Sequence, residues 1–233
     1  MVCKRMTQRL SMFALLSLAL VLSSTRSQAE MYVAGQVGAT IPNDLTDVQT
    51  VGPAAGLKLS DVSLHNSFMY GAKLGYYFDS VQFNAVKWLG VETEVFNTNP
   101  NIKQQNLTIS GPGVSATIPV TGQDLRVLNW SPVTVVVRYQ VGQFEPYAGV
   151  GMGVYFARVH DGQSGESSSD TSVGLNTQLG ARYLVTKHLS VFGEWKYNRA
   201  HFNFDPSSPT QSTGGFKGDY SANILAFGVG YHF

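Results

Sequence analysis

Seven charged residues recur at alternating positions of extended segments, on the side that carries few large apolar residues. Four are basic and three are acidic: Lys73, Glu92, Glu94, Arg138, Arg182, Glu194 and Lys196. An isolated buried charge is very costly, so charges that share one interior must pair or meet water. The set therefore suggests either a path for protons or ions, or a salt-bridged plug. We favour the plug, because, if these segments are the strands of a small closed barrel, its interior is barely wide enough for its own side chains.

A second candidate for chemistry is a histidine, a serine and a glutamate that lie close together in the sequence. His188 precedes Ser190 by two residues, and Glu194 follows four residues later. Such a set can activate a hydroxyl group for attack on an acyl ester, but this glutamate is too close in sequence for that role. His160 and His201 lack the spacing of metal ligands. We therefore expect no catalytic, cofactor-binding or metal-binding residues.

Eight segments with a period of two carry these charges. This period indicates β-strands, because successive side chains of a strand point to opposite faces. Each segment is long enough to cross a bilayer at a tilt, which takes about 9–11 residues. The expected strands are residues 31–40, 68–78, 88–97, 125–140, 145–159, 171–185, 189–202 and 220–233.

The last of these segments indicates which face of the strands contacts an apolar medium. Its large apolar residues share one parity: Leu225, Phe227, Val229, Tyr231 and Phe233. In the other strands too, charges and glycines occupy the face opposite the apolar one, which predicts a barrel that is apolar outside and polar inside. Val33 and Val37 set the outer face of the first strand. The outward residues nearest the short connections form an aromatic girdle at one membrane interface: Tyr76, Phe78, Tyr139, Tyr183, Tyr231 and Phe233.

The connections between the expected strands alternate in length. Residues 41–67, 98–124, 160–170 and 203–219 form long connections, whereas 79–87, 141–144 and 186–188 form short ones. Long loops outside the cell and short turns in the periplasm are typical of outer-membrane barrels, and the order places both termini in the periplasm. Within the second long connection, two β-prone runs, 107–110 and 114–118, flank a glycine-proline turn and predict a hairpin.

The first 29 residues are expected to be a cleaved signal peptide. Basic residues precede a short apolar run over 10–23, and Ser27 and Ala29 suit a cleavage site before Glu30. Residues 30–233 would then form one domain without cysteine, since Cys3 is the single cysteine. Cleavage removes four of the 16 basic residues and leaves 12 against 15 acidic ones, a charge of −3. That charge argues against a nucleic-acid partner.

The chain resembles the small outer-membrane proteins of the OmpA-like and OmpX-like kind, with an outer-membrane β-barrel domain of the porin family. The resemblance covers the mature chain and rests on MYVAGQVGAT, SFMYGAKLGYYF, GARYLVTKHLSVFGEWKYN and AFGVGYHF. It implies an all-β fold: an eight-stranded antiparallel up-and-down transmembrane β-barrel with long extracellular loops and short periplasmic turns. It implies the outer membrane of a Gram-negative bacterium, with lipid and lipopolysaccharide as surroundings. The terminal pattern resembles the signal that the barrel-assembly machinery reads, at Phe227, Val229, Tyr231 and Phe233.

Because this family contains anchors, adhesins and a few enzymes, the resemblance leaves the function open. We expect a monomeric, non-enzymatic envelope protein with a structural or adhesin-like role, in which extracellular loops hold any surface ligand. One alternative is a lipid A-modifying enzyme, since the His188 and Ser190 pattern is similar to that of outer-membrane lipid A deacylases. Here Val191 and Phe192 follow the serine in place of the Asn-Ala of that family. The other alternative is a narrow, porin-like solute pore.

Overall fold

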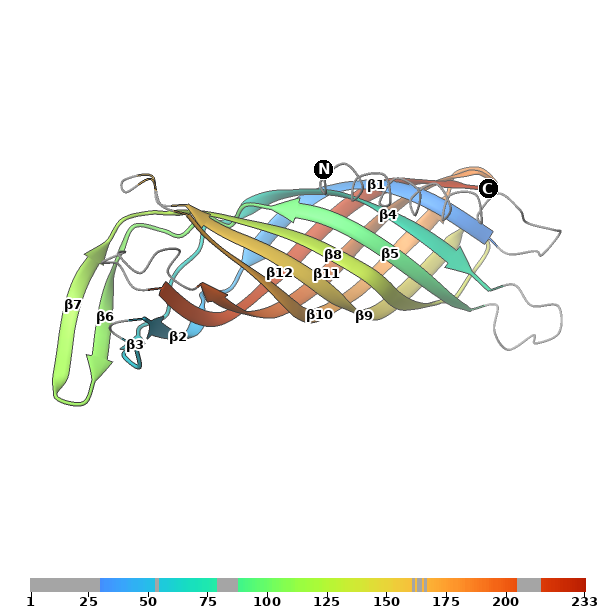
Figure 1. Ribbon diagram of the computed structural model, residues 1–233. Helices are drawn as coiled ribbons and strands as arrows, with labels where there is room; N and C mark the ends of the chain where they lie inside the picture. Colours follow the sequence, from blue (N-terminus) through green and yellow to red (C-terminus); the bar gives the residue numbers. More distant parts are fainter. Residues whose placement is uncertain are drawn as a thin grey trace, which may run out of the picture.

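The protein is described by a computed structural model for residues 30–52, 55–78, 88–160, 162, 165, 167–204 and 215–233 (Figure 1). The expected signal peptide lies outside the described residues. The described residues form twelve strands in one antiparallel sheet. Among them there is no helix long and apolar enough to cross a membrane.

Eight of the strands form a closed barrel, which confirms the expected fold. They are β1 (Glu30–Pro42), β4 (Ser67–Tyr77), β5 (Leu89–Thr98), β8 (Asp124–Arg138), β9 (Phe144–His160), β10 (Ser167–Leu184), β11 (Leu189–Phe204) and β12 (Gly215–His232). Each pairs with the next, and β12 closes the ring by pairing with β1, for example at Gly230 and Ala34. Closure leaves no free edge in the barrel wall, as a membrane requires.

The two faces of the wall differ as the alternation predicts. Outward side chains such as Phe227 and Met152 are each 67% exposed, whereas inward neighbours such as Ala226 are almost fully buried. Val33 and Val37 face outward, as expected for the first strand. In β8 the parity changes at a bulge between Trp130 and Val133. Pro132 lies in that bulge, where a residue without an N–H group removes no regular ladder bond.

The barrel continues beyond the length that a bilayer requires. Strand β9 has 17 residues, and β10 and β12 have 18 each, against about 9–11 for a membrane crossing. At the long-loop end, β12 pairs with β2 (Thr46–Val51), and β3 (Lys58–Leu59), β6 (Gln105–Gly111) and β7 (Val114–Val120) follow (Figure 1). The β6–β7 hairpin was expected from the sequence. Strands β2 and β3 differ from the sequence expectation of a long connection over residues 41–67.

The long-loop end has a hydrophobic core of its own, which we call the upper core. It joins inward side chains of the long strands to residues of the connections. Its sixteen buried members are Leu45, Val48, Val62, Leu64, Ile102, Leu107, Leu125, Val127, Tyr155, Ala157, Val159, Ala200, Phe202, Phe204, Tyr220 and Ala222. The connections that line the barrel mouth are therefore fixed to its wall by packing.

At the opposite, short-turn end, inward glycines make room for large inward side chains. A Cβ atom at Gly75 would lie 2.1 Å from the Tyr32 ring, and one at Gly228 would lie 2.3 Å from the Phe192 ring. These distances are far below van der Waals contact. The inward glycines thus let a narrow barrel hold the aromatic rings that surround its charges.

Candidate functional site

The middle of the barrel interior contains an ion-paired cluster centred on Glu194 of β11. Its carboxylate oxygens lie 2.8 Å from Lys73 Nζ and 3.0 Å from Lys196 Nζ. Lys73 Nζ also lies 3.6 Å from Glu92 Oε2, and Lys196 pairs with Glu94. The side chains of all five residues are at most 1% exposed. Ion pairs across the interior therefore connect three strands, β4, β5 and β11.

A second ion-paired cluster lies nearer the short turns. Glu145 of β9 accepts from Arg138 Nη1 through one oxygen and from Arg182 Nη1 through the other, both at 2.9 Å. Arg138 also lies 2.6 Å from Glu30 Oε2 at the start of β1. The Arg182 side chain is 1% exposed and that of Arg138 9%. The second cluster therefore begins in the dry interior and ends at the rim.

Neutral donors add hydrogen bonds to two of the buried carboxylates, those of Glu194 and Glu92. Tyr147 donates its hydroxyl to Glu194 Oε2 at 2.8 Å. Gln178 donates to Glu92 at 2.6 Å, and Tyr32 donates to the other oxygen of Glu92. A buried ion pair is stable only when such additional hydrogen bonds satisfy the remaining lone pairs. The donors come from β1, β9 and β10, so the network connects strands on opposite sides of the barrel.

Aromatic rings face the buried cations. Arg138 Cζ lies 3.6 Å from the Tyr77 ring centroid, and Arg182 Cζ lies 4.1 Å from that of Tyr32. The electron-rich face of a ring attracts a cation most strongly where water is excluded. The rings therefore replace part of the hydration that the guanidinium groups lose.

The seven charged residues chosen from the sequence all lie in these two clusters. Sequence reasoning missed two further acids, Glu145 and Glu30. Both share parity with inward neighbours, Glu145 with Tyr147 and Glu30 with Tyr32, so the alternation itself was the signal that could have identified them. With Glu145 included, four buried acids match four basic residues, and Glu30 adds a further negative charge at the rim.

A layer of neutral polar side chains separates the charged clusters from the upper core. Asn176 donates to Ser131 Oγ at 2.6 Å, and Asn198 donates to Asn176 Oδ1 at 3.0 Å. Asn198 also donates to the Tyr155 hydroxyl, which in turn donates to the Leu175 carbonyl oxygen at 2.7 Å. The interior therefore changes from charged to neutral polar to apolar along the barrel axis.

The three residues of the sequence-level esterase pattern do not come together. Glu194 belongs to the lysine cluster, and His188 Nδ1 contacts the His232 carbonyl oxygen at 2.9 Å. Instead, Ser190 Oγ lies 2.8 Å from His232 Nε2, and His232 Nδ1 lies 2.6 Å from Glu30 Oε1. This order matches a serine-nucleophile relay.

The Ser190 relay lacks the access that catalysis needs. Ser190 is 0% exposed and His232 is 3% exposed, so a substrate carbonyl cannot approach the hydroxyl in this conformation. Glu30 also pairs with Arg138. The relay therefore links β1, β11 and β12 at the seam where the barrel closes. Among the described residues, no group of three or more His, Cys, Asp or Glu side chains could hold a metal ion.

Aromatic side chains ring the outer wall at two heights. Near the short turns, Phe78, Tyr139, Tyr183, Tyr231 and Phe233 are exposed, and Tyr76 is partly exposed. A second set, not noticed in the sequence, lies toward the long loops: Phe68, Tyr70, Trp130, Phe156 and Trp195. The outward residues of the last strand, Phe227, Val229, Tyr231 and Phe233, are 49–71% exposed. Two aromatic belts that flank an apolar band are typical of a barrel in a bilayer.

Known structures show the same fold. The outer membrane protein OprG from Pseudomonas aeruginosa is 18% identical, with a TM-score of 0.57 over 89% of this chain and 97% of that one. The outer membrane protein AlkL is 16% identical, with a TM-score of 0.52 over 91% of this chain and 93% of that one. At this identity the likeness concerns the fold alone. No curated protein matches the sequence.

A family model that covers nearly the whole sequence identifies the family of this chain. The family model described as outer membrane protein beta-barrel domain matches residues 11–233. This match spans all the barrel strands and the four strands beyond them. The chain therefore belongs to the outer membrane protein beta-barrel domain family and is a small β-barrel protein of the bacterial outer membrane.

Proposed function

We propose that the protein is a non-enzymatic surface-interaction protein whose barrel anchors an extracellular sheet, and whose interior is closed. The observation that carries this proposal is the filling of the interior at successive levels. Ion pairs occupy the membrane level, a neutral layer follows, and the upper core fixes the mouth. A closed interior favours an anchoring role over passage of solute.

The β6–β7 hairpin is the surface that we propose for interaction. Strand β7 ends the sheet order and pairs with β6 alone among the described strands. Residues 115–119 are exposed, and residues 104–123 contain no charged side chain. Proteins commonly protect free edges with charge, because a free edge offers unpaired backbone groups to another strand. An uncharged edge on the cell surface therefore suits an extended partner segment that adds to the sheet.

This role is tested by blocking the edge. Cells that produce an Ile118→Lys variant should adhere to host cells or to each other less than cells with the unchanged protein, because a lysine on β7 opposes strand addition. Thr108→Lys, on β6, is the matched control, because it adds the same charge away from the free edge. Heat-modifiable gel mobility checks that both variants fold. Equal adhesion by all three proteins would exclude this edge as the interaction surface.

Two measurements distinguish this proposal from the two alternative functions, a narrow solute pore and a lipid A-modifying enzyme. Planar-bilayer recordings should show no conductance steps, because side chains fill the interior; regular steps would instead favour a narrow pore. Mass spectrometry of lipid A should give the same species with and without the protein. A changed acylation pattern that is lost in Ser190→Ala would favour a lipid-modifying enzyme.

We further propose that the outward residues of β12, Phe227, Val229, Tyr231 and the terminal Phe233, are read during assembly. Their exposed, aromatic-rich row supports this role. The Phe233 backbone N–H also donates to the Met31 carbonyl oxygen at 3.0 Å, across the closing seam. Deletion of Phe233 should lower the folded fraction in membrane extracts. An unchanged folded fraction would exclude the terminal residue as part of the signal.

A further inference from the structure

Two arginines face each other on the outer wall. Arg126 of β8 and Arg158 of β9 are paired residues in the antiparallel register, and both side chains are exposed. Like charges directly opposite each other destabilise a strand pair. A nearby acid, or an anion from outside the protein, would relieve this repulsion.

Neither guanidinium group has a carboxylate within ion-pair distance among the described residues. Arg126 Nε donates to Asn97 Oδ1 at 2.7 Å, and Arg158 Nη2 donates to Ser167 Oγ at 3.3 Å. Asp124, two residues before Arg126, accepts instead from Asn101. Asn97 is 4% exposed, so a buried side chain holds the exposed Arg126 through a partly buried hydrogen bond. Most donors of the two guanidinium groups remain available to a ligand.

A third arginine of the outer wall shows the contrast. Arg199 of β11 lies 3.0 Å from Asp219 Oδ2 on β12, and Asp219 also contacts His201. Its charge is thus neutralised within the protein. The missing partner is a property of the β8–β9 pair rather than of arginines on this wall in general.

The height of the pair indicates which anions it meets. Arg126 and Arg158 are the next outward residues beyond Leu128 and Phe156, with which the exposed apolar band of β8 and β9 ends. Side chains just beyond that band lie at the level of the lipid headgroups. In the outer leaflet of this membrane those headgroups belong to lipopolysaccharide, whose lipid A carries phosphate.

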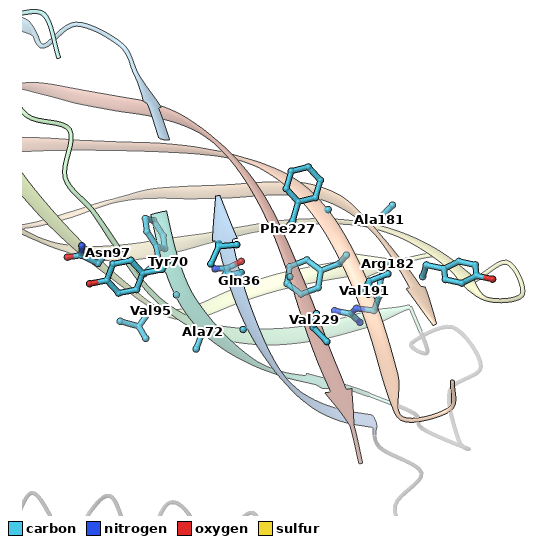
Figure 2. A pocket seen from close by; sticks show the side chains of 18 of the residues that line it. Gln36, Tyr70, Ala72, Val95, Asn97, Ala181, Arg182, Val191, Phe227 and Val229 are labelled. Carbon is cyan, nitrogen blue, oxygen red and sulfur yellow. The ribbon is translucent and has the colours of Figure 1, made fainter. Parts of the chain in front are cut away.

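An apolar groove on the same wall leads up to Arg126. It crosses neighbouring strands, and its lining includes Val37, Tyr70, Ala72, Val95, Leu128 and Phe227. Figure 2 shows Tyr70, Ala72 and Val95 along one stretch of this groove, with Asn97 at one end. The small residues Gly35 and Ala72 leave space between the larger side chains. A groove with an apolar floor and an arginine at its upper end matches a lipid with an acyl chain and an anionic head.

We infer that Arg126 and Arg158 bind a phosphate of lipopolysaccharide, with an acyl chain in the adjoining groove. Guanidinium groups bind phosphate through paired, charge-assisted hydrogen bonds, and two of them can share one phosphate. The bound phosphate would offset the repulsion between the two cations. This inference depends on the membrane setting and not on the β6–β7 hairpin, so either proposal can fail alone.

The test uses the purified, folded protein in detergent micelles with lipid A that carries two phosphates as the probe. Native mass spectrometry should detect a bound lipid A. The Arg126→Met/Arg158→Met double variant should bind it at least about tenfold more weakly, since each charge-assisted bond contributes more than the 1.4 kcal/mol of one tenfold step. Arg199→Met, which removes a neutralised arginine from the same wall, should bind as the unchanged protein does.

Two further binding experiments identify which part of the ligand the protein recognises. Dephosphorylated lipid A should bind as weakly to the unchanged protein as lipid A does to the double variant. Excess inorganic phosphate should leave lipid A bound, because it lacks the acyl chain; full displacement by phosphate would overturn the lipid assignment. Gly35→Leu fills the groove at a position where an added Cβ meets nothing within 4 Å, and it should weaken binding severalfold. Equal binding by the double variant and the unchanged protein would overturn the site altogether.

Discussion

The barrel has two interiors of opposite character. At membrane height the inside is filled by ion pairs among Lys73, Glu194 and their neighbours, whereas the upper core consists of sixteen buried side chains without a charge. Strand β11 passes through both. Its inward residues change from Glu194 and Lys196 to Phe202 and Phe204, while its outward residues change from Trp195 to Arg199.

This reversal follows from the solvent outside the wall. In the bilayer the outer face must be apolar, so the polar residues of the strand are left for the inside, where they must pair. Above the bilayer the outer face meets water, so the apolar residues turn inward, as in a soluble protein. Along β11 there is a height at which the polar residues switch from the inner face to the outer face. That height therefore marks the membrane boundary on the protein.

The largest effect is expected where two lysines depend on one carboxylate. Glu194→Gln removes the charge that both Lys73 and Lys196 contact and should lower the free energy of unfolding by about 3–5 kcal/mol, because a buried cation loses compensation. Urea unfolding in lipid vesicles, followed by tryptophan fluorescence, measures this change. Unaltered stability would mean that water reaches the lysines and that the interior is not closed.

A smaller and more local effect is expected in the upper core. Leu64→Ala removes a buried side chain, 4% exposed, from a connection that joins this core, and should cost about 2–3 kcal/mol. Because the connection is not part of the barrel wall, hydrogen exchange should quicken around β2, β3 and β6 while the barrel stays protected. Faster exchange throughout the barrel would instead show that the two interiors unfold as one unit.

At the rim of the charged interior the expected effect is smaller again. Arg138→Met should cost about 1–2 kcal/mol, because Glu145 keeps its contact with Arg182 and the rim is open to water. The same unfolding experiment measures it. A loss as large as that of Glu194→Gln would show that the rim is as dry as the centre.

The smallest effect is expected on the outer wall above the membrane. Lys217→Met changes a partly exposed residue of β12 that has no ion pair among the described residues, and should alter stability by no more than about 0.5 kcal/mol. It serves as the control for the three interior changes. A loss of several kcal/mol here would mean that removal of any charge destabilises the barrel.

The sequence by itself determined the barrel, its strand number and the face of nearly every residue. These properties follow from a period of two and from alternating loop lengths, which are local features. The same alternation placed Lys73, Glu194 and five other charges inside. The alternation also predicts an inward side chain at Glu145, which the sequence analysis does not include. It likewise bears on the outward aromatic residues Trp130 and Phe156, but the second aromatic belt to which they belong is not part of the sequence prediction.

Only the tertiary structure decided which charges meet. Lys73 and Glu194 are 121 residues apart. The registers of β4, β1, β12 and β11 align Lys73 with Ser190, four residues before Glu194, so the contact across the interior depends on strand tilt and stagger. The Arg126 and Arg158 pair likewise depends on register, since a shift of one residue would turn one of them to the other face. Strands β2 and β3 form because β12 extends beyond the membrane and offers an edge at Phe216 and Lys217. Alternation fixes the side to which a residue points, whereas stagger around a closed sheet fixes what it meets there.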